Sequence, residues 1–177
     1  MDMSLQIVRD VLFAALLIAS AITDLRERRI LNALTYPALL SGLLLALAAG
    51  AGSFLSAAGG AILAAAVLYP FCRAGGMGLG DLKLLAAVGA LEGFTMGASA
   101  LVDSVFVGGI FAAGVAVSRG DLPATLKRSL RVPGALVRSA RRRGAATLRP
   151  ARAGDAIPYG VAIALGSAAA WWWRWPW

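Results

Sequence analysis

The sequence contains no histidine, a single cysteine and few charged residues, and each shortage excludes a class of chemistry. Without histidine the chain cannot build a Ser-His-Asp triad, a Cys-His pair or an H-E-x-x-H zinc site. One cysteine, Cys72, cannot supply a disulfide framework or a multi-cysteine zinc cluster. We therefore expect neither a metal nor another cofactor, and carboxylates are the leading candidates for any catalytic groups.

The small number of charged residues also indicates that the chain folds in contact with a membrane. Charged residues make up 15% of the 177 residues and hydrophobic residues 59%, and the mean hydropathy is +0.76. A soluble domain carries about 25% charged residues. Because so few polar residues cannot cover the surface, we expect contact with a lipid bilayer, which excludes a soluble enzyme. Residues 1–177 are predicted to form one integral-membrane domain.

Long apolar runs predict the fold. A helix needs about 17–20 apolar residues to cross a bilayer core, and its backbone groups must be satisfied internally. Six such runs predict an all-α, multi-pass membrane protein with six transmembrane helices: Leu5–Thr23, Leu34–Ala51, Phe54–Cys72, Leu82–Ala98, Leu101–Val117 and Ile157–Trp173. The first run also contains a small-x-small triplet typical of signal-peptide cleavage, Ala19-Ser20-Ala21, but the net-negative stretch before it argues against a cleaved signal.

The distribution of lysine and arginine predicts the orientation. Fifteen of the 17 basic residues lie in three segments that six spans would place on one side: after the first run, before the fourth, and between the fifth and sixth. The positive-inside rule makes this side cytoplasmic and places both termini outside. The basic loop, about 119–156, then serves to fix topology, or alternatively binds anionic headgroups or a partner. It lacks interleaved aromatic residues, so we expect no nucleic-acid partner.

Carboxylates near the bilayer are costly in free energy, so each is a candidate for a chemical role. The side of the membrane on which each one lies follows from whether it ends an odd-numbered or opens an even-numbered run. Asp24 ends the first run and Asp81 opens the fourth, so both are predicted at the cytoplasmic boundary; Asp155 lies on the same side. Two carboxylates held close together cannot both ionise easily, so one can act as base while the other keeps its proton. Taken singly, each aspartate also suits a simple helix end, and Asp81 at a helix N-terminus is favourable for the helix dipole.

The segment before Asp81 is rich in glycine. Four glycines occupy six positions in Gly75-Gly76-Met77-Gly78-Leu79-Gly80, and Lys83 follows the aspartate. Glycine lets a second chain approach the backbone closely. A phosphate-binding loop would require G-x-x-x-x-G-K-[ST], which is absent, and Asp81 would repel phosphate. A substrate-binding segment and a plain interhelical turn both remain open from these residues alone.

Three stretches resemble the type IV prepilin peptidase family. The segment from Gly78 to Leu85 is similar to its G-x-G-D-x-K-L motif, and Asp24 to Asn32 resembles its other aspartate segment, with Leu31 where proline is usual. The segment from Ile157 to Ala164 is similar to the start of its last helix. The short length and the lack of a cysteine-rich zinc insert resemble the short form associated with tight-adherence (Flp) pili.

The resemblance implies an activity and its residues. It implies a multi-pass aspartic endopeptidase of the bacterial or archaeal cell membrane, which removes the leader from prepilins and pseudopilins at the cytoplasmic boundary. Whether the chain also methylates the product stays open, although we expect proteolysis only. Carried over, Asp24 and Asp81 are the catalytic pair, while Gly78, Gly80 and Lys83 lie where the extended substrate binds. The oligomeric state stays open.

A different function class competes with this hypothesis. The chain is alternatively a non-catalytic membrane subunit or an ion-relaying transporter, which would use carboxylates deep in the membrane. Glu92 is the candidate for that role, because it lies eleven residues beyond Asp81, or about 16 Å deeper along a helix.

Overall fold

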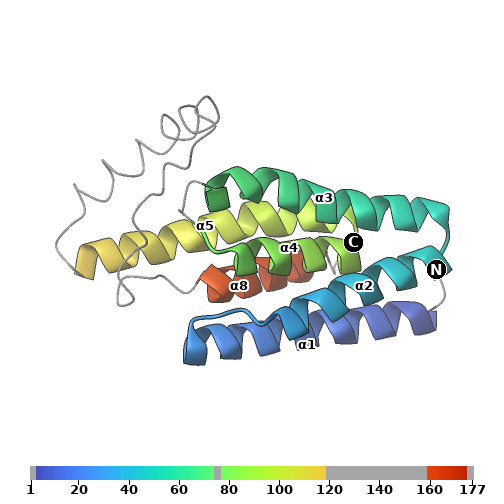
Figure 1. The fold of residues 1–177 in the computed structure, drawn as a ribbon, viewed down its shortest axis with the longest axis horizontal. Coiled ribbons are helices and arrows are strands. Elements are labelled where there is room, and N and C mark those ends of the chain that lie inside the picture. Colours follow the sequence, from blue (N-terminus) through green and yellow to red (C-terminus); the bar gives the residue numbers. More distant parts are fainter. Residues whose placement is uncertain (1–2, 74–76, 119–158, 175–177) are drawn as a thin grey trace.

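The computed structural model describes residues 3–73, 77–118 and 159–174, and these residues form a bundle of helices (Figure 1). In chain order the helices are α1 (Met3–Glu27), α2 (Asn32–Ala48), α3 (Ala51–Arg73), α4 (Leu79–Glu92), α5 (Phe94–Ser118) and α8 (Tyr159–Arg174). The predicted all-α architecture is thus confirmed for the part of the chain that is described. The basic loop 119–156, with Asp155, lies outside it.

Three of these helices are long and apolar enough to cross a membrane: Met3–Glu27, Ala51–Arg73 and Phe94–Gly114. Helix α2 is apolar but has 17 residues, and α4 and α8 have 14 and 16. The protein is therefore a membrane protein by its helices, while six complete spans with both termini outside stay a prediction.

The fourth helix ends earlier than the apolar run Leu82–Ala98 predicts. Helix α4 ends at Glu92, and α5 already begins at Phe94. Between them Gly93 adopts a φ of +87°, a conformation that side-chain-bearing residues rarely adopt. The N–H of Phe94 donates to the Ser56 hydroxyl oxygen of α3 at 3.0 Å, which holds the turn in place. Hydropathy alone missed this boundary because apolar residues lie on both sides of the glycine.

Helix α4 is the centre of the bundle. It is buried almost continuously from Leu84 to Glu92, as expected for a helix that is apolar on all sides. Its neighbours approach closely through glycines: a Cβ atom at Gly42 of α2 would lie 2.7 Å from the carbonyl carbon of Ala90, and one at Gly60 of α3 would lie 2.7 Å from the carbonyl oxygen of Gly89. Small residues at helix contacts are how membrane helices pack without large side chains.

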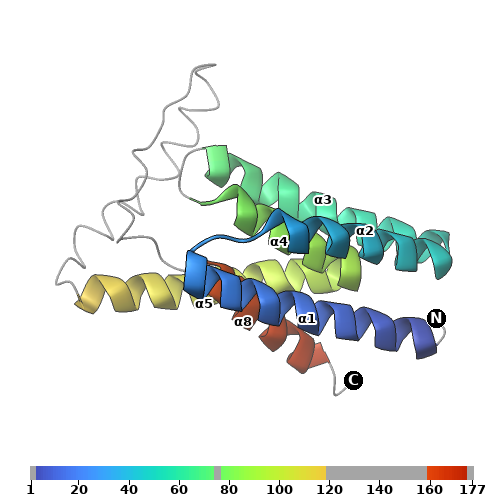
Figure 2. The same cartoon turned by 60° about the horizontal axis from the view of Figure 1, so that its bottom comes forward.

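The helices are arranged so that several functional segments meet at one end. The two views place the C-terminal end of α1 and the N-terminal ends of α4 and α8 at the same end of the bundle (Figures 1 and 2). The start of α1 lies at the other end. The predicted cytoplasmic segments around Asp24 and Asp81 therefore share one end of the molecule.

Candidate active site

Asp24 lies on the buried face of α1. The buried residues of this helix are Phe13, Leu16, Leu17, Ser20 and Asp24, a spacing of three and four that defines one helix face. Asp24 is the last member of that face, and 7% of its surface is exposed. The helix runs on for only one further turn, so a carboxylate lies where the apolar stripe would otherwise continue.

The segment after α1 begins with a residue in the left-handed backbone conformation and packs against the start of α4. The N–H of Arg28 donates to the carbonyl oxygen of Asp24 at 2.9 Å, and Arg28 has a φ of +52°. The following segment brings Ile30 against the start of α4, where a Cβ atom at Gly80 would lie 3.1 Å from the Ile30 Cβ. The two motif segments predicted from the sequence are therefore in direct contact.

Asp81 is held in the first turn of α4. Gly78 caps the helix, and its N–H donates to Oδ2 of Asp81 at 3.1 Å, the backbone half of a capping box. Asp81 is 8% exposed. A Cβ atom at Gly78 would lie 3.2 Å from Oδ2 of Asp81, so the glycine also leaves room for the carboxyl group. The Cys72 thiol at the end of α3 donates to the carbonyl oxygen of Gly78 at 3.5 Å.

Helix α8 supplies a hydrogen bond that the sequence did not reveal. The N–H of Val161 donates to Oδ2 of Asp24 at 3.2 Å, across 137 residues of sequence. A Cβ atom at Gly160 would lie 2.8 Å from that same oxygen, so only glycine lets α8 approach so closely. The only sequence signal for this contact was the resemblance of residues 157–164 to the family's last helix. Tyr159, at the start of α8, lies close enough to Asp81 for the two side chains to interact electrostatically.

The two carboxyl groups therefore share one buried site. Asp81 precedes the apolar run that begins at Leu82, and burial, followed by the negative charge of Asp24, raises its pKa from 3.8 to about 7. The hydrogen bond from Gly78 opposes that rise. At neutral pH the site can thus hold a proton on Asp81, and an acid and base pair requires that one of two adjacent carboxyl groups keeps its proton.

Lys83 contacts α2. Its Nζ donates to Oδ1 of Asn32 at 2.9 Å and lies 4.9 Å from the centre of the Tyr36 ring. The lysine therefore connects α4 to the start of α2, beside the site. Its predicted role in binding substrate, like those of Gly78 and Gly80, stays a prediction.

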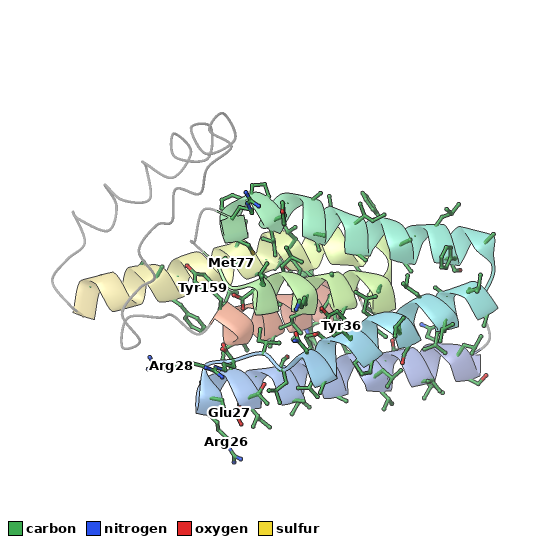
Figure 3. All side chains as sticks on the ribbon, viewed as in Figure 1. Arg26, Glu27, Arg28, Tyr36, Met77 and Tyr159 are labelled. Carbon is green, nitrogen blue, oxygen red and sulfur yellow. The ribbon has the colours of Figure 1, made fainter. Side chains whose placement is uncertain are left out.

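Charged residues lie at the end of α1, which is also the end of the bundle that holds the two aspartates. Figure 3 shows Arg26, Glu27 and Arg28 at the same end of the bundle as Met77 and Tyr159. Among the described residues, no group of three or more His, Cys, Asp or Glu side chains is placed to hold a metal ion.

Comparison with known protein families decides the family. A sequence model described as the type IV leader peptidase family matches residues 11–113, which include both aspartates and more than half of the chain. The chain belongs to the type IV leader peptidase family. Its membership makes it a leader-peptidase-like protease, and the resemblance to the family is confirmed at that level, whereas the short form and the details of the motifs stay predictions. Comparisons with curated proteins and with solved structures found no match.

Proposed function

We propose that this type IV leader peptidase is an aspartic endopeptidase that removes the leader from type IV or Flp-type prepilins at the cytoplasmic membrane boundary. The observation that carries the proposal is the meeting of Asp24 and Asp81, from helices far apart in sequence, in one buried site. Placing two buried carboxyl groups side by side does not stabilise the fold, because burial and mutual repulsion both disfavour their charged forms. A shared proton gives them a chemical use.

The contacts of the two aspartates suggest their roles. Asp24 accepts the N–H of Val161, a hydrogen bond that stabilises an ionised carboxylate, so Asp24 acts as the general base. It takes a proton from a water molecule as that water attacks the scissile carbonyl carbon. Asp81, whose pKa is about 7, keeps its proton and donates a hydrogen bond to the carbonyl oxygen. Proton transfer to the leaving amine then completes hydrolysis.

An apolar groove beside the site fits a substrate whose cleavage point precedes a hydrophobic helix. The groove has a volume of about 590 Å³ and lies between α1 and α8. One wall includes Ala21, which lies three residues before Asp24, and the other includes Ala164, which lies three residues after Val161. The groove therefore runs to within one helical turn of the carboxylate. The apolar part of a prepilin would lie in it while the basic leader stays on the cytoplasmic side.

Co-expression with prepilin precursors tests the proposal. Leader removal is followed by mass spectrometry for the wild type and for Asp24→Asn, Asp81→Asn and Asp155→Asn, with insertion of each variant checked in membranes. Asparagine keeps the size and polarity of aspartate but cannot act as a carboxylate base. We expect the first two variants to leave the precursor intact and the third to cleave it. A wild-type protein that cleaves none of a panel of precursors would contradict the proposal and favour a non-catalytic or ion-relaying role.

A further inference from the structure

A second interaction joins the helices that carry the two aspartates, at the opposite end of the bundle. Nε of Arg9 on α1 lies 3.4 Å from Oε1 of Glu92 on α4. The Glu92 side chain is 1% exposed and that of Arg9 is 16% exposed. Arg9 lies fifteen residues before Asp24, or about 22 Å along α1, and Glu92 lies about 16 Å beyond Asp81 along α4. Neither residue reaches the catalytic groups.

Glu92 occupies a position where a negative charge is unfavourable on its own. It is the last residue of α4, and the carbonyl groups at a helix C-terminus repel a carboxylate. It also lines a cavity of about 300 Å³ with Arg9, Ser53 and Ser56. A buried charge of this kind needs a close partner of opposite sign, and Arg9 supplies it. Buried ion pairs contribute little net stability, and their best-attested use is to fix the register of the elements they join.

Helix α1 makes little direct packing contact with α4, so an ion pair between them could fix their relative position. Helix α1 packs chiefly on α8 and α2, whereas α4 packs chiefly on α3 and α2. The direct contact between α1 and α4 is small by comparison. Tight packing therefore does not by itself set where Asp24 lies relative to Asp81. At the catalytic end, Asp24 is held by Val161 of α8, a third helix.

We propose that the Arg9–Glu92 ion pair is a positioning device that fixes α1 against α4 and thereby sets the separation of Asp24 and Asp81. This inference rests on the proposed peptidase function. Arg9 and Glu92 act through the two helices, so they are positioning residues. A displacement of about 1 Å at reacting groups can lower a rate by about a hundredfold. A loosened pair should therefore slow catalysis without weakening substrate binding.

The test uses two double variants in the purified full-length protein. Arg9→Gln with Glu92→Gln removes both charges, so the net charge of the chain is unchanged and no long-range electrostatic effect is introduced. Arg9→Glu with Glu92→Arg restores an ion pair of reversed polarity. Asp103→Asn is the matched control, because it removes a single carboxylate from α5 and leaves both α1 and α4 unchanged.

The measurements are kcat and KM for cleavage of a prepilin precursor across a range of pH. We expect the neutral double variant to lower kcat roughly ten- to hundredfold at an unchanged KM. Its loss of activity at alkaline pH should also begin at lower pH, because a more distant Asp24 raises the pKa of Asp81 less. Besides Asp24, the titratable groups in the described part of the chain that interact with Asp81 are Cys72 on α3 and Tyr159 on α8, and the variants leave both unchanged. The swapped variant should recover both properties, and the control should match the wild type.

Three outcomes would overturn the inference: a neutral double variant with wild-type kcat, a loss of kcat without any shift of the pH profile, or a swapped variant that recovers nothing. The second outcome would indicate a role in stability alone. Failure of the proposed function is seen separately in the same assay, because it would appear as a wild-type protein that leaves the precursor uncut.

Discussion

Replacement of Gly160 by alanine tests how closely α8 approaches the carboxyl group of Asp24. The new Cβ atom would lie 2.8 Å from Oδ2, 2.9 Å from Cγ and 3.0 Å from Cβ of Asp24. Atoms at these distances overlap, so either α8 or the aspartate must move. The N–H of Val161, which donates to the same Oδ2, would move with the helix.

The size of the effect follows from the cost of overpacking. An extra methyl group in a packed interior costs typically about 1–3 kcal/mol. If that cost displaces Asp24 from its working position, the transition state loses the same energy, and kcat falls about 5- to 150-fold. Alanine also favours a helix over glycine by up to about 1 kcal/mol, so α8 itself should not be weakened. The variant should therefore fold and insert but cleave slowly.

Initial rates of leader removal, measured with purified protein, check this prediction. The matched control is Gly109→Ala on α5, where an added Cβ atom would meet no other atom within 4 Å. We expect the control to cleave at the wild-type rate and to melt at the same or a slightly higher temperature. A Gly160→Ala protein with the wild-type rate would refute the argument, because it would mean that Asp24 does not need its present position.

Two further predictions concern pH and packing. Because burial raises the pKa of Asp81 to about 7, a reaction that needs its proton should lose activity as the pH rises through about 7. The folded state also holds this proton more tightly than the unfolded state, so the free energy of unfolding should fall between about pH 4 and pH 7. The contribution of Asp81 to this fall should disappear in Asp81→Asn. An activity that stays constant from pH 6 to about pH 9 would contradict that assignment. A Cβ atom at Gly89 would lie 2.5 Å from the carbonyl carbon of Gly60. Gly89→Ala should therefore lower the free energy of unfolding, measured by denaturant titration, by about 1–3 kcal/mol. Gly52→Ala is the control and should not lower it, because a Cβ atom there would have no neighbour within 4 Å.

Much of the helical arrangement could be predicted from the sequence, because apolar runs in lipid must become helices. The runs beginning at Leu5 and Phe54 correspond closely to α1 and α3. The boundary at Gly93 could not be read from hydropathy, because a single glycine with a positive φ, fixed by Ser56, interrupts an otherwise apolar stretch. Local composition carries no signal for a turn that a neighbouring helix holds in place.

The candidate site was predictable in its residues but not in its contacts. Asp24 and Asp81 were selected by parity and by their motifs, and the structure places both in one buried site. The contact of Val161 with Asp24 joins residues 137 positions apart, and only tertiary packing creates it. Glu92 could be identified as a costly carboxylate, but its partner Arg9 lies on a helix whose packing against α4 no local pattern specifies.

The most direct test of the central claim is a double-mutant comparison of the two aspartates. The rate of cleavage of one prepilin precursor is measured for purified wild type, Asp24→Asn, Asp81→Asn and the variant with both changes. Groups that act as a unit are strongly non-additive, so either single change should abolish detectable cleavage and the second should remove nothing more. A single variant that retains substantial cleavage, with the two losses multiplying in the double variant, would contradict a shared catalytic site.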